Sequence, residues 1–275
     1  MLSGLREVRR HRRDYRPALQ KCLKLGKMAG GCRTLLAMAG ARIERADQVT
    51  GSYFWGAPPN YRGAEWPHGR RHQRLGEDEY PLVLVACLDL AAAHRFVPWL
   101  PESGRLLFFY DEEEGPWGDR REDREGWRVI YVRESDVLPG VAEAPAALGE
   151  SAEMPPVHID FTWIDSDDQG TQSSEVDEPC HQIGGLPRAV QSDEMPVMCQ
   201  LLSNGFRLHN DPDLTEEIAE ALEPGIADWR LLMQVDTDDD LPAMWGDFGC
   251  IYFWVREQEA RVADFQNVWV LVQSH

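Results

Sequence analysis

The sequence has no long apolar run, no paired cysteines and no overall excess of positive charge. No segment approaches the roughly 18 uninterrupted apolar residues of a membrane-spanning helix. The six cysteines are scattered, no two are spaced as Cys-x-x-Cys, and no secretory apolar segment stands at the start. Reduced thiols in a cytoplasm are therefore expected. The net charge of −19 excludes nucleic-acid binding over the whole surface.

The signatures of common catalytic sites are also missing. The chain has no G-x-x-x-x-G-K-[ST] phosphate loop, no G-x-S-x-G elbow, no H-E-x-x-H motif and no G-x-G-x-x-G after a predicted strand. We therefore expect no catalytic residue, no bound metal and no cofactor, and an enzyme activity outside these classes stays open.

The positive charge that is present is concentrated at the start of the chain. Residues 1–50 hold 12 Lys and Arg against 4 Asp and Glu, a net of +8, which leaves −27 for the remainder. Residues 1–41 are predicted to form a basic helical arm, because Leu2–Leu25 carries a partial apolar stripe and Thr34–Arg42 could form a second helix. The arm either packs on the body as a helical cap or docks on a partner.

The body, residues 42–275, is predicted to be a strand-rich α+β domain. Short runs of β-branched and aromatic residues predict strands at 81–90, 104–110, 127–132, 157–164, 229–235, 250–255 and 268–273. A helical turn is expected at 90–94 and helices at 192–203 and 211–222. The last helix would have Asp211 as its N-cap and a buried stripe made of Leu214, Ile218, Ala221 and Leu222.

Two parts of the body repeat the same order of segments. W-G-A-P at 55–58 matches G-G-L-P at 184–187, and the run that ends at Asp89 matches the run that ends at Asp236. G-R-L-L-F-F-Y from 104 and W-R-V-I-Y-V from 127 match G-C-I-Y-F-W-V from 249 and W-V-L-V-Q-S from 269. We therefore expect two fused repeats, about 52–138 and 157–275, related by a pseudo-twofold axis. They would form mostly antiparallel sheets with peripheral helices.

The same segments carry a family resemblance. The motifs Trp66-Pro67, Leu106–Asp111, His181–Pro187, Trp229–Asp236, Met244–Trp254 and Val268–Gln273 resemble those of the YwqG-like family, bacterial proteins largely of unknown function. The resemblance covers about residues 42–275, and Trp55 departs from it because a glycine is usual there. It implies a duplicated, strand-rich core and no established enzyme activity. Some members are encoded beside polymorphic toxin genes, which is compatible with a toxin-neutralising role.

One candidate site is an acidic loop that contains Asp236, Asp238, Asp239, Asp240 and Asp247. The spacing of the first Asp residues resembles the start of a calcium loop. However, the sixth position is Leu rather than the Gly that such a loop needs, and the twelfth is Asp247 rather than Glu. A solvated turn, or a contact with a basic partner, is favoured over a metal site.

Two further candidate sites come from other motifs, one before a Gly-Gly turn and one within the loop itself. His181 and Gln182 precede a Gly-Gly turn, where the imidazole could serve as a ligand or base, or could cap the turn by hydrogen bonding. Trp245 and Asp247 could line a pocket for a polar or cationic ligand. In the alternative they form a buried corner, in which Asp247 accepts backbone N–H bonds.

These observations predict a non-enzymatic cytoplasmic protein that binds another protein. A basic partner such as a toxin would be drawn to the acidic body, as in an immunity-type protein. The alternative is a small-ligand-binding protein or an enzyme with its site near the acidic-aromatic loop 236–247 and His181.

Overall fold

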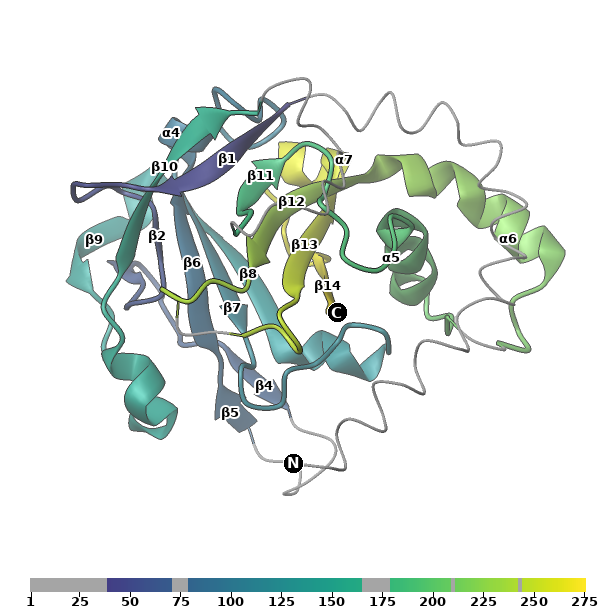
Figure 1. The fold of residues 1–275 in the computed structure, drawn as a ribbon, viewed down its shortest axis with the longest axis horizontal. Coiled ribbons are helices and arrows are strands. Elements are labelled where there is room, and N and C mark those ends of the chain that lie inside the picture. Colours follow the sequence, from purple (N-terminus) through teal and green to yellow (C-terminus); the bar gives the residue numbers. More distant parts are fainter. Residues whose placement is uncertain (1–38, 71–78, 165–178, 209–210, 242–243) are drawn as a thin grey trace.

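The computed structural model describes residues 39–70, 79–164, 179–208, 211–241 and 244–275 (Figure 1). Residues 1–38 of the expected helical arm lie outside this described part. Within the described part, every helix is too short or too polar to traverse a lipid bilayer.

One ten-stranded antiparallel sheet forms the centre of the molecule (Figure 1). Its strand order is β14-β13-β12-β11-β1-β10-β2-β6-β7-β8. The bounds are β1 (Gly40–Arg45), β2 (Tyr53–Phe54), β6 (Val83–Asp89), β7 (Arg105–Tyr110), β8 (Trp127–Val132), β10 (Val157–Trp163), β11 (Gln182–Gly184), β12 (Trp229–Asp236), β13 (Cys250–Arg256) and β14 (Trp269–Gln273). The strand-rich antiparallel prediction is confirmed, because all seven predicted strands are present in this sheet.

The sheet curls until it is nearly barrel-shaped, so that its edge strands β8 and β14 approach each other. The indole N–H of Trp127 in β8 donates to the carbonyl of Val268, at 2.9 Å, just before β14. The Trp127 and Trp269 rings meet edge to face at 5.5 Å. Residues 117–118 fill the remaining gap, because Trp117 accepts from the Val272 N–H and Gly118 accepts from the Trp269 indole.

Both faces of the sheet are buried at β6, β7, β12, β13 and β14, which explains why these strands read as continuous apolar runs. In β7, Leu106 and Phe108 belong to the main core, whereas Leu107 and Phe109 belong to a second, smaller core. Across the main core the rings of Phe108 and Phe253 meet at 5.1 Å, which joins the two ends of the sheet.

Different elements cover the two ends of the sheet. Over β6–β8 lie the small pairs β3 (Pro59–Tyr61) with β9 (Val137–Val141) and β4 (His68–Arg70) with β5 (Glu79–Pro81). Over β12–β14 lie α5 (Met195–Ser203) and α7 (Glu257–Arg261), whereas α6 (Glu216–Leu222) packs on η5 (Glu223–Asp228), which in turn packs on α5 (Figure 1). The remaining short helices are α4 (Leu90–Ala93), η2 (Glu122–Gly126), η3 (Glu134–Asp136) and η4 (Ala146–Glu153).

Two helix predictions need correction. Residues Gly40–Arg42, expected at the end of a helix, lie in β1, where Ala41 and Ile43 are buried between β10 and β11. The helix expected from Asp211 begins only at Glu216 with Thr215 as its N-cap, because the Asp211 carboxylate accepts the N–H groups of Arg207 and Asp213 instead. The predicted stripe of this helix is not buried, and Ala221 is exposed.

Candidate functional site

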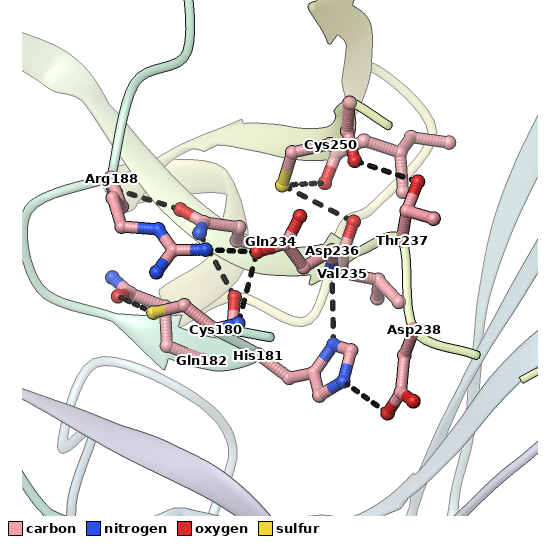
Figure 2. A network of polar contacts seen from close by, with 12 residues as sticks. Cys180, His181, Gln182, Arg188, Gln234, Val235, Asp236, Thr237, Asp238 and Cys250 are labelled. Carbon is pink, nitrogen blue, oxygen red and sulfur yellow. Dashed lines mark hydrogen bonds and ion pairs between the residues drawn. The ribbon is translucent and has the colours of Figure 1, made fainter. Parts of the chain in front are cut away.

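His181, just before β11, is held by both of its ring nitrogens (Figure 2). Its Nδ1 accepts the backbone N–H of Asp236 at 3.1 Å. That nitrogen is therefore unprotonated, and in the neutral ring the proton sits on Nε2, which donates to Asp238 Oδ2 at 3.3 Å. Burial lowers the pKa of His181 below its ordinary value of 6.5. The arrangement fixes one neutral tautomer and leaves neither nitrogen open for base catalysis.

Asp238 and Asp240 bind the guanidinium of Arg45, at the end of β1. The Arg45 Nη atoms lie 3.5 Å from Asp238 Oδ2 and 2.8 Å from Asp240 Oδ2. Burial raises the pKa of Asp238, but hydrogen bonds from the Asp240 N–H and from His181, together with Arg45, outweigh burial and hold this pKa below its usual range. This part of the acidic loop is therefore partly neutralised within the chain, with one guanidinium against two carboxylates.

Asp236 occupies a separate, buried ion pair (Figure 2). Its Oδ2 accepts from the Arg188 guanidinium and from the Cys180 N–H, the latter at 3.0 Å. The carboxylate thus points away from His181, although its own backbone N–H donates to that ring. Asp236, Asp238 and Asp240 consequently do not converge on one point, as ligands of a calcium loop must.

Buried glutamines anchor the segment that carries these residues. Gln182 donates to the carbonyls of Gly184 and Leu186 at 3.0 and 2.7 Å. Gln234 accepts the Arg188 N–H at 2.9 Å and donates to the Cys180 carbonyl at 3.0 Å. Because a buried amide is costly unless it is satisfied, these bonds fix the 180–188 segment against β12.

The loop between β12 and β13 is compact because Thr237 ties its two limbs together. The Thr237 N–H and hydroxyl both donate to the Gly249 carbonyl at 2.9 Å, and the hydroxyl accepts the Trp245 N–H at 3.0 Å. The side chains of Leu241 and Trp245 are buried beneath the loop. Trp245 packs on Tyr110 and Trp55, at ring distances of 5.5 and 6.4 Å.

Carboxylates and apolar side chains of the same loop are exposed. Asp239, Asp240 and Asp247 are exposed. Met244 and Phe248 are 59% and 58% exposed. Phe248 also has a φ of 49°, a left-handed conformation that is uncommon for a bulky residue. We call Asp239, Asp240, Met244, Asp247 and Phe248 the loop surface.

The structure thus divides the predicted site residues into three groups. His181 joins Asp236 and Asp238 in one polar network, and Gln182 supports it from the buried side. Trp245 is buried on aromatic neighbours, whereas Asp239 and Asp247 face solvent. A convergent pocket made of Trp245, Asp247 and His181 is therefore not formed.

Two important residues of the network were missed in the sequence. Arg45 and Arg188 form ion pairs with the acidic loop, yet they lie far from it along the chain. A signal for Arg45 exists in the alternation of G-A-R-I-E-R, which is typical of a half-buried strand rather than a helix. Among the described residues, no three His, Cys, Asp or Glu side chains are grouped closely enough to hold a metal ion.

Comparison with known proteins gives a family but no activity. A search among curated proteins finds no match for the chain. A family model, described as a domain of unknown function, matches residues 52–273, which is consistent with the YwqG-like resemblance. This range spans β2 to β14 and includes the whole acidic loop. The chain therefore belongs to the DUF1963 family.

Proposed function

We propose that the chain is a non-enzymatic protein-binding protein whose loop surface recognises a basic partner. The observation that supports this proposal is the exposure of Met244 and Phe248 beside the exposed carboxylates of Asp239, Asp240 and Asp247. Solvent-exposed apolar groups with a polar rim are typical of protein interaction sites. A compact loop closed by its own side chains is also a frequent carrier of function.

The charge of the chain favours a cationic partner. Residues 51–275 carry a net charge of −27, which attracts cations over long distances and speeds encounter. The loop already binds one guanidinium, that of Arg45, through Asp238 and Asp240. An arginine or lysine of a partner would find the same chemistry at Asp239 and Asp247.

For the partner we propose a basic toxin that acts on nucleic acid, and for the chain an immunity-type role in the cytoplasm. The family resemblance supports the toxin, since some relatives are encoded beside toxin genes. The four described cysteines are buried, and none of them forms a disulfide with another described cysteine, as expected of a protein in a reducing compartment.

We also infer that the loop surface belongs to the second of two fused repeats. Three equivalences support this inference. Counted inward from either end of the sheet, the strands follow the same order, so that β2, β6, β7 and β8 correspond to β11, β12, β13 and β14. The register of β6–β7 shifts between Leu84 and Ala86, and that of β12–β13 shifts at the matching place, between Leu231 and Met233. The turns at 55–56 and 184–185 both have two successive positive φ angles.

The test is a pull-down from the native cell at low and moderate salt, with the purified chain captured through a C-terminal tag. We expect one stoichiometric basic partner that is lost as the salt concentration rises. The double variant Asp239→Asn/Asp247→Asn should weaken binding about tenfold at low salt by removing the attracting charges. Phe248→Asn should weaken it to a similar extent, and Asn tolerates the left-handed backbone.

The matched control is Glu143→Gln/Glu150→Gln, which removes the same charge from exposed positions outside the loop. The proposal is wrong if no partner is captured, or if the control weakens binding as much as the loop variants do.

One observation favours the alternative of a small-ligand site. The indole N–H groups of Trp55 and Trp245 are buried and have no hydrogen-bond partner in the described part of the chain. A ligand with a hydrogen-bond acceptor would satisfy them. A thermal-shift screen that finds a stabilising ligand for the natural chain, but not for Trp245→Phe, would support this alternative.

A further inference from the structure

We propose that His181 is a pH-sensitive clamp on the loop between β12 and β13. The neutral imidazole holds the start of this loop, and protonation of the imidazole releases it. The inference goes beyond the proposed function, because the clamp acts in the free chain whether or not a partner binds the loop surface.

The hydrogen bonds of the ring are compatible only with its neutral form (Figure 2). Nδ1 accepts the backbone N–H of Asp236, the last residue of β12, and Nε2 donates to Asp238 in the loop. Both nitrogens of an imidazolium are donors, so a proton on Nδ1 would point at the proton of the Asp236 amide. Because Asp236 is buried, leaving its N–H without an acceptor is costly.

The ring cannot relieve this repulsion by turning over in place. A half-turn about the Cβ–Cγ bond would put ring carbons where the two nitrogens now lie, and the bond to Asp238 would be lost as well. Phe54 of β2 packs against the ring with centroids 5.2 Å apart, and the His181 side chain is only 10% exposed. A charged imidazole is therefore hydrated only after the ring and the start of the loop have separated.

The charges that face the ring do not compensate for its burial. Burial lowers the pKa of His181 below its ordinary value of 6.5, although the Asp238 and Asp236 carboxylates raise it. Arg45, at the end of β1, also lowers this pKa and competes for the Asp238 carboxylate that would hold an imidazolium. β2 contributes the uncharged ring of Phe54. Once the imidazole is hydrated its pKa returns toward 6.5, so a falling pH favours the released state.

The other end of the sheet shows that the fold does not need a histidine for this contact. Asp89, the last residue of β6, donates its backbone N–H to the Ser52 hydroxyl at 2.8 Å. A serine hydroxyl does not titrate near neutral pH, whereas an imidazole does. The contact at Asp236 thus adds a response to acid that the contact at Asp89 lacks.

Amide hydrogen exchange in the full natural chain tests the clamp. Exchange is followed by NMR from about pH 7.5 to about pH 5, with and without a low concentration of urea, and corrected for the intrinsic rate. The amide of Phe108, in the central part of β7, reports global unfolding. Two-bond proton–nitrogen spectra show over the same range which nitrogen of His181 carries a proton.

We expect the Asp236 amide to exchange faster than that of Phe108 and to respond less to urea, as a local opening does. Its protection should fall as His181 takes up a proton, by at most about tenfold for each pH unit below 6.5, because one proton is linked to the opening. At neutral pH the spectra should show the proton on Nε2 alone.

A matched pair of variants assigns the effect to the ring. His181→Ser supplies a hydroxyl in place of the imidazole and should abolish the pH dependence of exchange at Asp236. His68→Ser, at an exposed histidine, should preserve it. If His181→Ser does not fold, the titration of the natural chain decides alone.

Three results would overturn the inference: His181 stays neutral until the chain unfolds, His181 is protonated while the Asp236 amide keeps its protection, or Asp236 exchanges with the rate and urea response of Phe108. These results are independent of the pull-down. If the loop is released in acid but no partner is captured, the clamp stands and the proposed function fails. If a partner is captured but acid releases nothing, the proposed function stands and the clamp fails.

Discussion

At both ends of the main sheet, β6–β8 and β12–β14, a side chain accepts the backbone N–H of the aspartate that ends a strand, but the accepting side chain differs. In the first, the Ser52 hydroxyl accepts the N–H of Asp89 at 2.8 Å. In the second, His181 Nδ1 accepts the N–H of Asp236 at 3.1 Å. The backbone group and the place in the sheet correspond, and only the accepting atom has changed. A histidine at this position therefore has a structural role that a serine fulfils elsewhere in the chain.

The difference grows beyond this shared contact. Asp89 caps the short helix α4 through the Ala91 N–H and pairs with Arg105. Asp236 instead pairs with Arg188 and leads into the acidic loop, which exposes Met244 and Phe248. The two ends therefore share one backbone contact and differ in the charged partner of the aspartate and in the side chains that follow it.

The largest loss of stability is expected when the contact between the two ends of the sheet is broken. Replacing Trp127 with Ala removes a fully buried ring, its hydrogen bond to Val268 and its contact with Trp269. We expect the free energy of unfolding to fall by about 3–5 kcal/mol, measured by urea denaturation. Trp163→Ala, at a site where the ring is 65% exposed, is the control and should cost much less.

The next largest effect is expected at Gly184, in the turn that follows His181. Gly184 has a φ of 59°, and a Cβ there would lie 2.3 Å from the Ala39 carbonyl oxygen. Gly184→Ala should therefore cost about 2–4 kcal/mol, through backbone strain plus this clash. Gly63 has a φ of 74° with nothing near its Cβ position, so Gly63→Ala isolates the cost of strain alone. Equal losses in the two variants, measured by thermal unfolding, would contradict the role of the clash.

A smaller effect compares the two acids. Asp236→Asn removes the buried carboxylate that accepts from the Arg188 guanidinium and from the Cys180 N–H, and we expect a loss of about 2 kcal/mol. Asp89→Asn, at the matching but more exposed position, should cost less than about 1 kcal/mol. Denaturation of both variants at neutral pH checks the order, which would be reversed if Asp89 were the more important support.

The smallest loss of stability is expected when His181 is replaced with serine, the residue type that makes the corresponding contact at Ser52. His181→Ser replaces the imidazole that accepts the Asp236 N–H with the type of side chain that accepts the Asp89 N–H. This change should lower the free energy of unfolding by about 1 kcal/mol at pH 7. Because burial lowers the pKa of His181 in the folded state, the unfolded chain binds the proton first as the pH falls below 6.5, and folded stability is lost there. The variant should therefore lose less stability between neutral and mildly acidic pH than the natural chain does.

The control for this exchange is His68→Ser, at an exposed histidine. At pH 7 its free energy of unfolding should stay close to that of the natural chain. If His181→Ser keeps the pH dependence of the natural chain, His181 is not the group that titrates.

The strands with long apolar runs could be predicted because both of their faces are buried, whereas the short connecting strands could not. β11 has only three residues and ends in a glycine with positive φ, so it carries no periodic signal. The first residues of β1 are predicted as the end of a helix, because the strand is short and its two arginines continue the basic composition of the residues before it. The late start of α6 reflects a local competition, in which Asp211 closes a turn rather than capping a helix.

The site could be predicted only as a set of residue types. His181 and Asp238 are 57 positions apart, and their contact depends on the pairing of β11 with β12, which no local pattern reveals. The same holds for Arg45, which reaches the loop because β1 pairs with β11. The exposure of Phe248 could not be predicted either, because aromatic residues in an apolar motif are usually buried.

The position of β1 has a consequence for how the protein is made. This strand is synthesised well before its two neighbours, β10 and β11, so that Ala41 is paired on both edges only after Trp163 and Ile183 have been made. Such distant pairing slows folding and leaves open strand edges on the growing chain. A fragment cut to the family match, residues 52–273, would lack this strand altogether and would expose β10 and β11 to aggregation.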